Sequence, residues 1–239
     1  MGEKSNRHSW YLVLKIVFFT FYYPPDLCAG SFRASALAQA FSKRMKDNDE
    51  LHIVTTHPNR YESHRIKADN IELFGNITVH RISVPDHKSG MFSQARTFAA
   101  YALASYKLGN NIKPDFLIGT TSRLMTGVLT GIVARKLGCR YFIDLRDIFS
   151  ETISDIFSQK SKLLGFILKA SFSLLEGWLF HRATGVNVVS GGFPEYFQTQ
   201  GLDTSQWSFY PNGVDKEFVN LSFSENEHPE NIKTILYAG

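Results

Sequence analysis

The sequence contains little cysteine. Only Cys28 and Cys139 occur among its 239 residues. They form no Cys-x-x-Cys pair and show none of the ligand spacings of a zinc site. A disulfide-rich secreted scaffold is therefore excluded, and we expect two reduced thiols in a cytoplasmic protein.

Runs of basic residues are also missing. The chain has 26 Lys and Arg against 22 Asp and Glu, a net charge of +4, with no five basic residues in a row. No aromatic and basic side chains alternate as they do on a base-stacking surface, so we expect no nucleic-acid partner. The mild positive charge suits anionic ligands such as nucleotide diphosphates or lipid phosphates.

Several ligand fingerprints are absent. There is no Gly-x-Gly-x-x-Gly, no Walker loop and no Gly-x-Ser-x-Gly, so a nicotinamide dehydrogenase lacks its usual motif. The eight histidines show no metal spacing, and Asp144 and Asp147 are too far apart in sequence for an Asp-x-Asp pair. We expect neither a bound metal nor a resident cofactor.

The N-terminus lacks the marks of a signal peptide or a membrane span. The apolar run from Trp10 to Tyr23 is shorter than the roughly 20 residues that cross a bilayer. The residues that follow, Pro24-Pro25-Asp26, give no small-residue cleavage site. We predict a buried strand within this run and a disordered leader over residues 1–10.

What the sequence does contain is a regular alternation of strands and helices. Apolar runs indicate buried strands, and apolar residues at a 3.6-residue period indicate helices. Strands are predicted over 12–20, 51–55, 77–84, 116–119, 140–144, 186–189 and 207–210. Helices are predicted over about 34–45, 92–108, 122–137 and 162–182, with Thr121 or Ser122 capping the third helix and Gly138 ending it. A polar loop of about 20 residues is expected before residue 77.

This order predicts an α/β fold with a doubly wound, mainly parallel Rossmann-like sheet, over residues 11–221. In such folds ligands bind at the carboxyl ends of the strands. The loop after the first strand carries Gly30 and Ser31 at the start of a helix, with Arg33 in its first turns. A helix N-terminus suits a phosphate group. Alternatively Gly30 serves only a tight turn, and Arg33 is a solvated surface charge.

Other strand ends also carry polar residues. Asp144, Arg146 and Asp147 follow a buried strand and face the ligand cleft, or else they form an internal ion pair that fixes the loop. Further candidates for substrate binding lie at the ends of other strands; they are Thr120, Thr121, Ser190 and Asn212. Their hydroxyls can equally cap helices, and Asn212-Gly213 is a turn dipeptide whatever its function.

In this order the motifs resemble one family, the family 4 retaining glycosyltransferases of the GT-B fold. The chain is similar to members that build bacterial surface polysaccharides. The Tyr-Tyr-Pro-Pro stretch before Gly30 looks like their opening loop. Further similar segments are 113–118 (KPDFLI), 141–147 (YFIDLRD), 188–190 (VVS), 210–215 (YPNGVD) and 235–239 (ILYAG).

The resemblance implies that the chain is the N-terminal, acceptor-side domain of a glycosyltransferase. Such an enzyme transfers a sugar from a nucleotide-sugar to a polysaccharide or lipid-linked acceptor. The transfer retains the anomeric configuration of the sugar and needs no bound metal. It implies that Gly30 and Ser31 approach the donor diphosphate, and that Asp144, Arg146 and Asp147 lie near the sugar and acceptor. The chain departs from the family in two places. Ala29 stands where many members have a second glycine, and Arg146 stands where many have a histidine.

The resemblance also bears on where the chain stops. Residues 222–239 are expected to be a linker and the first strand of a C-terminal donor domain, so that residues 1–239 alone would be inactive. A non-catalytic sugar- or nucleotide-binding module is the alternative, and a Rossmann-type nucleotide-sugar epimerase or dehydrogenase is a third. The lipopolysaccharide-type assignment implies a cytoplasmic protein, peripheral on the inner face of the plasma membrane.

The segment 162–182 is very apolar, with its polar residues on one narrow stripe. Its wide apolar face is either a peripheral membrane contact or a surface buried against the sheet or a further domain. Lys169 and Glu176 argue against a spanning helix.

Overall fold

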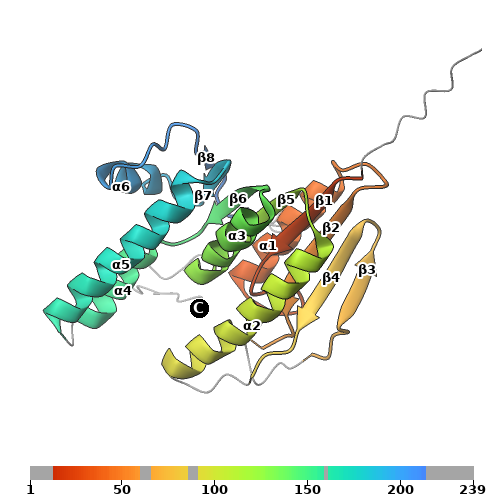
Figure 1. Ribbon diagram of the computed structural model, residues 1–239, viewed down its shortest axis with the longest axis horizontal. Coiled ribbons are helices and arrows are strands. Elements are labelled where there is room, and N and C mark those ends of the chain that lie inside the picture. Colours follow the sequence, from red (N-terminus) through yellow and green to blue (C-terminus); the bar gives the residue numbers. More distant parts are fainter. Residues whose placement is uncertain (1–12, 60–65, 86–90, 159–160, 214–239) are drawn as a thin grey trace, which may run out of the picture.

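The computed structural model describes residues 13–59, 66–85, 91–158 and 161–213. They form an eight-stranded sheet in the order β3-β4-β2-β1-β5-β6-β7-β8. All neighbouring strands are parallel except β3 and β4. The predicted doubly wound, mainly parallel α/β fold is confirmed (Figure 1).

The sheet order places the start of the chain at its centre. The strands are β1 (Lys15–Phe19), β2 (Glu50–Thr56), β3 (Ile71–Phe74), β4 (Ile77–Ile82), β5 (Phe116–Thr120), β6 (Arg140–Leu145), β7 (Gly185–Val188) and β8 (Ser208–Phe209). The helices are α1 (Ala29–Ser42), α2 (Met91–Ile112), α3 (Leu124–Leu137), α4 (Phe149–Ser158), α5 (Lys162–His181) and α6 (Phe193–Thr199). Strand order reverses between β1 and β5, the switch point where ligands bind in folds of this type.

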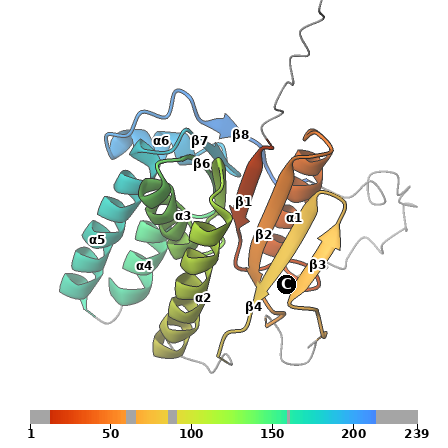
Figure 2. The ribbon, with the colours of Figure 1, turned by 45° about the vertical axis from the view of Figure 1, so that its right-hand side comes forward.

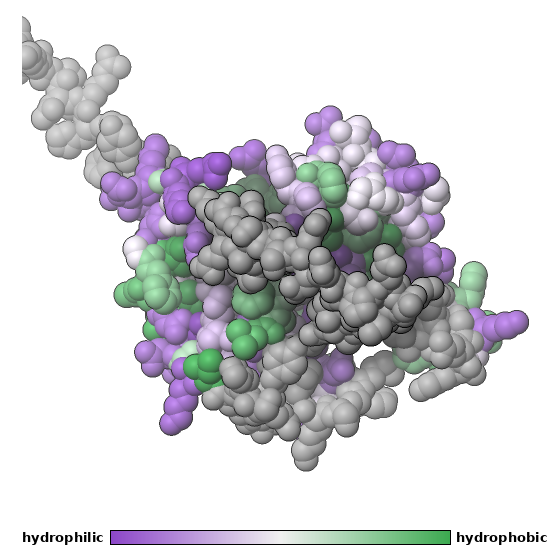
Figure 3. All heavy atoms as spheres, turned by 180° about the vertical axis from the view of Figure 1, so that it is seen from behind, coloured by the Kyte–Doolittle hydropathy of each residue, from purple (hydrophilic) through white to green (hydrophobic). Residues whose placement is uncertain are grey.

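Helices cover both faces of the sheet, which explains the continuous apolar runs in its central strands. Ala34 and Ala38 of α1 pack on one face, against Phe18 and Ile53. The other face packs against α2, α3, α5 and α6, whose buried residues include Tyr101, Val133, Leu179 and Phe197. Figure 2 shows α1 on the opposite side of the strands from α2 and α3. Seen from behind, the described surface mixes hydrophilic and hydrophobic areas (Figure 3).

The prediction of a polar loop before residue 77 was wrong in part. Residues Ile71–Phe74 form the edge strand β3, which pairs antiparallel with β4 through the turn at Gly75 and Asn76. Gly75 has φ +61, a left-handed conformation that glycine adopts without strain. The apolar side chains of β3 are exposed, so the run carries no burial pattern that would identify it as a strand.

Two expectations about helices also need correction. Arg123 stands at the N-cap position of α3, and no side chain caps this helix, so neither Thr121 nor Ser122 has the predicted capping role. Gly138 ends α3 in the left-handed conformation, as predicted. The helix α4 was not predicted. It packs against α5 as a helical hairpin, and the two helices lie side by side in both ribbon views (Figures 1 and 2).

A histidine pair joins β2 to β4 on the face that α2 covers. His52 Nδ1 lies 3.1 Å from His80 Nε2, and His52 Nε2 lies 3.1 Å from a carboxylate oxygen of Glu50. Burial lowers the pKa of His80, and the charge of His52 lowers it further. One ring must therefore be neutral to accept the proton that the two rings share.

This pair makes stability depend on pH. The pKa of His80 is about 6.5 in the unfolded chain and lower in the folded one, so the unfolded state binds more protons as the pH falls. Stability is full above about pH 6.5 and is lost as the pH falls toward the folded pKa. We expect a lower urea midpoint at about pH 5.5 than at about pH 7.5. The variant His80→Gln should flatten this dependence, and an unchanged slope would contradict the assignment.

Candidate functional site

A buried ion pair links α1 to the end of β6. Arg33 donates from Nε to Asp144 Oδ2 at 2.8 Å and from Nη2 to Asp144 Oδ1 at 2.7 Å. The side chains are 9% and 1% exposed. Such a two-point contact fixes the guanidinium and the carboxylate in one plane. It therefore holds the first helix against the carboxyl end of β6.

Asn187 and the chain after β8 complete this cluster. The Asn187 side chain donates to Asp144 Oδ1 at 2.8 Å, and its carbonyl oxygen accepts from Tyr210 N–H at 2.9 Å. Arg33 also donates to the backbone oxygens of Tyr210 and Pro211, both at 3.0 Å. We call Arg33, Asp144, Asn187 and these two carbonyls the strand-end clamp. Asn187 is not among the residues predicted from the sequence, although a polar residue inside the apolar strand β7 was a usable signal.

The clamp assigns Asp144 a positioning role. Both of its carboxylate oxygens already accept hydrogen bonds, and the side chain is almost fully buried. A carboxylate whose oxygens are both bonded to protein donors keeps the loop after β6 in place. An ion pair does fix the loop, but the partner of Asp144 is Arg33 of α1 and not Arg146 of the same loop. Arg33 is therefore not the solvated surface charge considered from the sequence, and the catalytic role predicted for Asp144 gains no support from these contacts.

The next residues of this loop are fixed by β5 and α1. Thr121 donates its backbone N–H to the backbone oxygen of Asp144 at 3.0 Å, and its hydroxyl accepts from Arg146 N–H at 3.0 Å. The Arg146 guanidinium donates to the backbone oxygen of Ala29 at 3.1 Å. Three segments far apart in sequence thus meet at Arg146, which stays half-buried beside the start of α1.

The start of α1 is lined by groups that favour an anion. Its first intrahelical bond runs from Phe32 N–H to Cys28 O, so the N–H groups of the three residues between them have no acceptor within the helix. Cys28, at the N-cap, makes no side-chain cap. Within the part of the chain that the structure describes, the buried hydroxyls of Ser31 and Ser122 have no hydrogen-bond partner. Helix N-termini of this kind carry partial positive charge.

Gly30 lies at the centre of this region. A Cβ atom at position 30 would lie 3.4 Å from Ser122 Cβ, 3.6 Å from Arg146 Nη1 and 3.8 Å from Cys28 Sγ. These are ordinary van der Waals distances, so a side chain there would fit and would fill the space. We call Gly30, Ser31, Ser122 and Arg146 the α1 cradle. It combines a permanent cation, two hydroxyls and helix N–H groups at the switch point of the sheet.

Asp147 adds a second ionisable group beside the cradle. Desolvation raises the pKa of Asp147, and the neighbouring Arg146 offsets part of that rise. Desolvation lowers the pKa of Arg146, but its guanidinium remains charged at neutral pH. The loop after β6 therefore presents one cation and one carboxylate with an altered proton affinity, a combination typical of functional sites.

The remaining predicted site residues fall into two groups. Thr120 and Thr121 are buried, at 2% and 0% exposure, and the Thr121 hydroxyl accepts a hydrogen bond from the backbone N–H of Arg146. Their predicted contact with substrate gains no support from this geometry. Ser190 and Asn212 are exposed in the loops after β7 and β8, and their predicted binding roles stay predictions. Among the described residues, no group of three or more His, Cys, Asp or Glu side chains is arranged to hold a metal ion.

Proteins of known structure share this architecture. Sucrose-phosphate synthase from Thermosynechococcus elongatus matches 87% of this chain over 53% of its own, with 9% identity and a TM-score of 0.57. A second structure of that protein matches 86% of this chain over 92% of its own, with 12% identity and a TM-score of 0.53. Phytolacca americana UGT2, complexed with UDP-2fluoro-glucose and pterostilbene, matches 84% of this chain over 54% of its own, with 12% identity and a TM-score of 0.48.

These similarities concern the fold. The structural neighbours include glycosyltransferases of the GT-B fold, and this chain has the architecture of one of their Rossmann-like domains. It spans about half the length of the longer proteins that it matches. No protein-family model matches the sequence, and no curated protein is significantly similar to it.

Proposed function

We propose that this chain is the acceptor-side domain of a retaining glycosyltransferase of family 4. In this proposal the whole enzyme transfers a sugar from a nucleotide-sugar to a polysaccharide or lipid-linked acceptor. The observation that carries the proposal is the α1 cradle, an anion-binding geometry at the switch point of a GT-B-type sheet.

The cradle suits the diphosphate of a nucleotide-sugar. Hydrogen-bond donors lie around Gly30. They are the Arg146 guanidinium, which also donates to Ala29 O, the N–H groups at the start of α1, and the buried hydroxyls of Ser31 and Ser122. Donors of this kind stabilise the negative charge that grows on a diphosphate when the bond to the sugar breaks. The cradle would thus act both in binding and in the chemical step.

Asp147 is the residue we assign to the acceptor side of the reaction. Its raised pKa brings its carboxyl closer to the acidity of a group that exchanges protons near neutral pH. The charge of Arg146, its neighbour in the chain, offsets part of the rise in its pKa, while Asp144 and Arg33 hold the loop on which both residues stand. Asp144 is in this scheme a positioning residue.

The finer parts of the proposal follow from the family resemblance. They are retention of configuration without a metal or resident cofactor, a cytoplasmic location on the inner face of the plasma membrane, and a role in bacterial surface-polysaccharide or lipopolysaccharide assembly.

The segment 214–239 lies outside the described residues, and its assignment as a turn, a linker and the start of a donor domain stays a prediction. So does inactivity of residues 1–239 on their own. In the family that this chain resembles, the C-terminal donor domain carries two glutamates separated by seven residues, a Glu-x7-Glu pair. A reading frame that continues for about 130 residues and contains such a pair would favour the transferase over a complete binding module.

Binding of UDP tests the cradle. We expect Arg146→Ala to weaken UDP binding about tenfold or more, because a hydrogen bond to a charged group contributes about 1.5–3 kcal/mol. Gly30→Ala should weaken it as well, since the new methyl group fills the cradle at ordinary contact distances and leaves the fold intact. Calorimetric titration with UDP measures both effects.

Arg135→Ala is the matched control, because Arg135 is an exposed arginine near the end of α3. It should leave UDP affinity unchanged. Thermal unfolding of Gly30→Ala should match the unsubstituted chain, which separates a filled site from a damaged fold. If neither Arg146→Ala nor Gly30→Ala changed the affinity for UDP, the cradle would be ruled out as the binding site.

A further inference from the structure

Helix α5 exposes a continuous apolar stripe. Leu163, Phe166, Ile167 and Leu174 are 69%, 70%, 51% and 76% exposed. Together with Ala170 they follow the i, i+3, i+4, i+7 and i+11 positions of one helix face. We call these five residues the α5 stripe. The helix is long and apolar enough to cross a membrane, with a mean hydropathy of 1.5 over 18 residues, yet only 22% of that window is buried.

The polar stripe predicted for this segment faces inward. Gly165 and Glu176 are buried on the side of α5 that packs against α4. Glu176 accepts from the N–H groups of Phe149 and Ser150 at 3.0 and 3.3 Å and so caps the start of α4. Lys169 pairs with Glu151 of α4 at 2.6 Å. The hairpin therefore uses the polar side of α5 internally and turns the apolar side outward.

The described part of the sheet does not bury this apolar face, so of the alternatives drawn from the sequence a membrane contact and burial against a further domain remain. Only the C-terminal part of α5 reaches the core, through Leu179 and Phe180. Figures 1 and 2 show the other end of the α4–α5 hairpin extending away from the strands. The described elements therefore leave the stripe uncovered.

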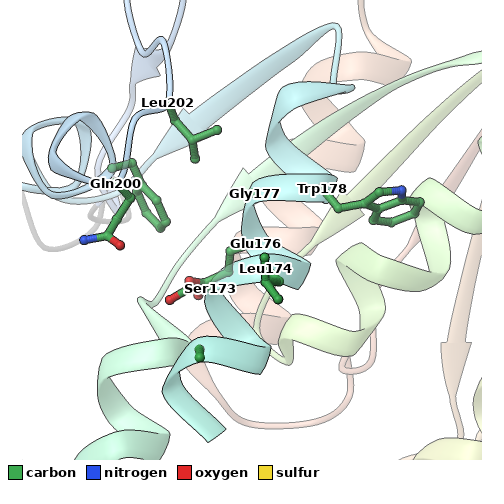
Figure 4. A pocket seen from close by; sticks show the side chains of 9 residues that line it. Ser173, Leu174, Glu176, Gly177, Trp178, Gln200 and Leu202 are labelled. Carbon is green, nitrogen blue, oxygen red and sulfur yellow. The ribbon is translucent and has the colours of Figure 1, made fainter. Parts of the chain in front are cut away.

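The stripe leads into a cavity. A hollow of about 510 Å³ lies between the second half of α5 and the region of α6. Its lining includes Phe197, Gln200 and Leu202, and also Glu176 of α5, whose carboxylate caps the start of α4. Ala170 and Leu174 belong to both the stripe and the cavity wall. Figure 4 shows Gln200 and Leu202 on one side of the hollow and the α5 residues on the other. An apolar surface that continues into a cavity of this size fits a chain-like hydrophobic ligand.

The charges around the stripe are positive. Lys162 is exposed at the start of α5, Lys169 is partly exposed, and Arg182 is exposed directly after the end of the helix. Glu176, the one acidic residue of α5, is 1% exposed. From the packed helix α4, Glu151 faces Lys169 and neutralises it in part. The exposed face of α5 thus offers cations and no carboxylate, which suits an anionic surface.

We propose that the α5 stripe docks on an anionic lipid bilayer, with the α5–α6 cavity open to a lipid chain. Leu, Ile and Phe beside Lys are the composition of helices that lie in the headgroup region of a membrane. The cores of protein interfaces are enriched in Tyr, Trp, Phe, Met and Arg, and of these five residue types the stripe contains only Phe, at Phe166. The inference deepens the proposed function, because a lipid-linked acceptor would be met at this surface, but the docking itself requires no sugar transfer.

Co-sedimentation with vesicles tests the docking. The 239-residue chain should bind vesicles of equal parts phosphatidylglycerol and phosphatidylcholine, and bind them less at high salt. Leu163→Gln and Phe166→Gln should each lower the partition constant about tenfold, because each removes a large apolar side chain from the bilayer. Lys162→Glu should weaken binding to the anionic vesicles and leave binding to pure phosphatidylcholine unchanged.

Leu103→Gln is the matched control, since Leu103 of α2 is 66% exposed and lies away from α5. It should bind vesicles like the unsubstituted chain, and circular dichroism should show that all variants fold. Vesicle binding that Phe166→Gln leaves intact would overturn the proposal. So would a dimer in light scattering that Phe166→Gln dissociates while no vesicle binding occurs, because the stripe would then be a protein interface. Docking without any sugar transfer by the intact enzyme would count against the proposed function alone.

Discussion

Asp144→Asn is expected to lower the free energy of unfolding by about 3–5 kcal/mol, the usual cost of breaking a buried ion pair from one side. The substitution keeps the shape of the side chain but removes its charge. Arg33, at 9% exposure, then remains charged without a carboxylate partner. Urea unfolding followed by circular dichroism measures the difference.

Two comparisons show whether the cost comes from burial. Lys15→Met breaks the ion pair with Glu50, whose side chains are 39% and 43% exposed, and should cost less than about 1 kcal/mol. A double variant with Arg33→Met and Asp144→Leu should recover much of the lost stability, because no buried charge is left alone. A cost for Asp144→Asn as small as that of Lys15→Met would show that the clamp is not a buried charge pair in solution.

Gly119→Ala is expected to destabilise the fold by about 1–3 kcal/mol or more through overpacking. A Cβ at this position would lie 2.2 Å from Thr130 Oγ1 and 2.9 Å from Thr130 Cβ. Both residues belong to packed elements, β5 and α3, so neither can move without disturbing its neighbours. The unfolding midpoint in urea is the direct measurement.

Combining Gly119→Ala with Thr130→Ala identifies the cause. The second substitution removes the nearer contact atom, so the pair should be more stable than Gly119→Ala alone. Gly177→Ala in α5 is the control, since nothing lies within 4 Å of its added Cβ. It should raise stability by about 0.5–1 kcal/mol through helix propensity. Equal losses at positions 119 and 177 would contradict a steric origin.

The sheet could be read from the sequence because its central strands are buried on both faces. Val17, Phe18 and Phe19 form an uninterrupted apolar run, and β5 begins with another one, Phe116-Leu117-Ile118. The strand β3 and the helix α4 were missed for different reasons. The apolar side chains of β3 face solvent, so its sequence shows no burial pattern. The first N–H group of α4, that of Phe149, is capped by Glu176, a residue 27 positions away in sequence.

The candidate site was only partly predictable. The rule that ligands meet the carboxyl ends of strands led to Gly30, Ser31 and Arg146, which the structure brings together. The partnership of Arg33 with Asp144 spans 111 positions, and nothing in the local sequence distinguishes it from a solvated charge. Ser122 was considered only as a helix cap, because its place beside Gly30 depends on how β5 packs against β1.

The strand-end clamp also gives the domain a mechanical property. Tyr210 and Pro211 are held by Arg33 and Asn187, and through them by Asp144 at the end of β6. A pull on the chain beyond Pro211 would therefore reach the first helix and the loop of Arg146 directly, without first stretching β8. Because Arg33 stands on α1 and Asp144 at the end of β6, these hydrogen bonds couple the position of the chain at Pro211 to both elements.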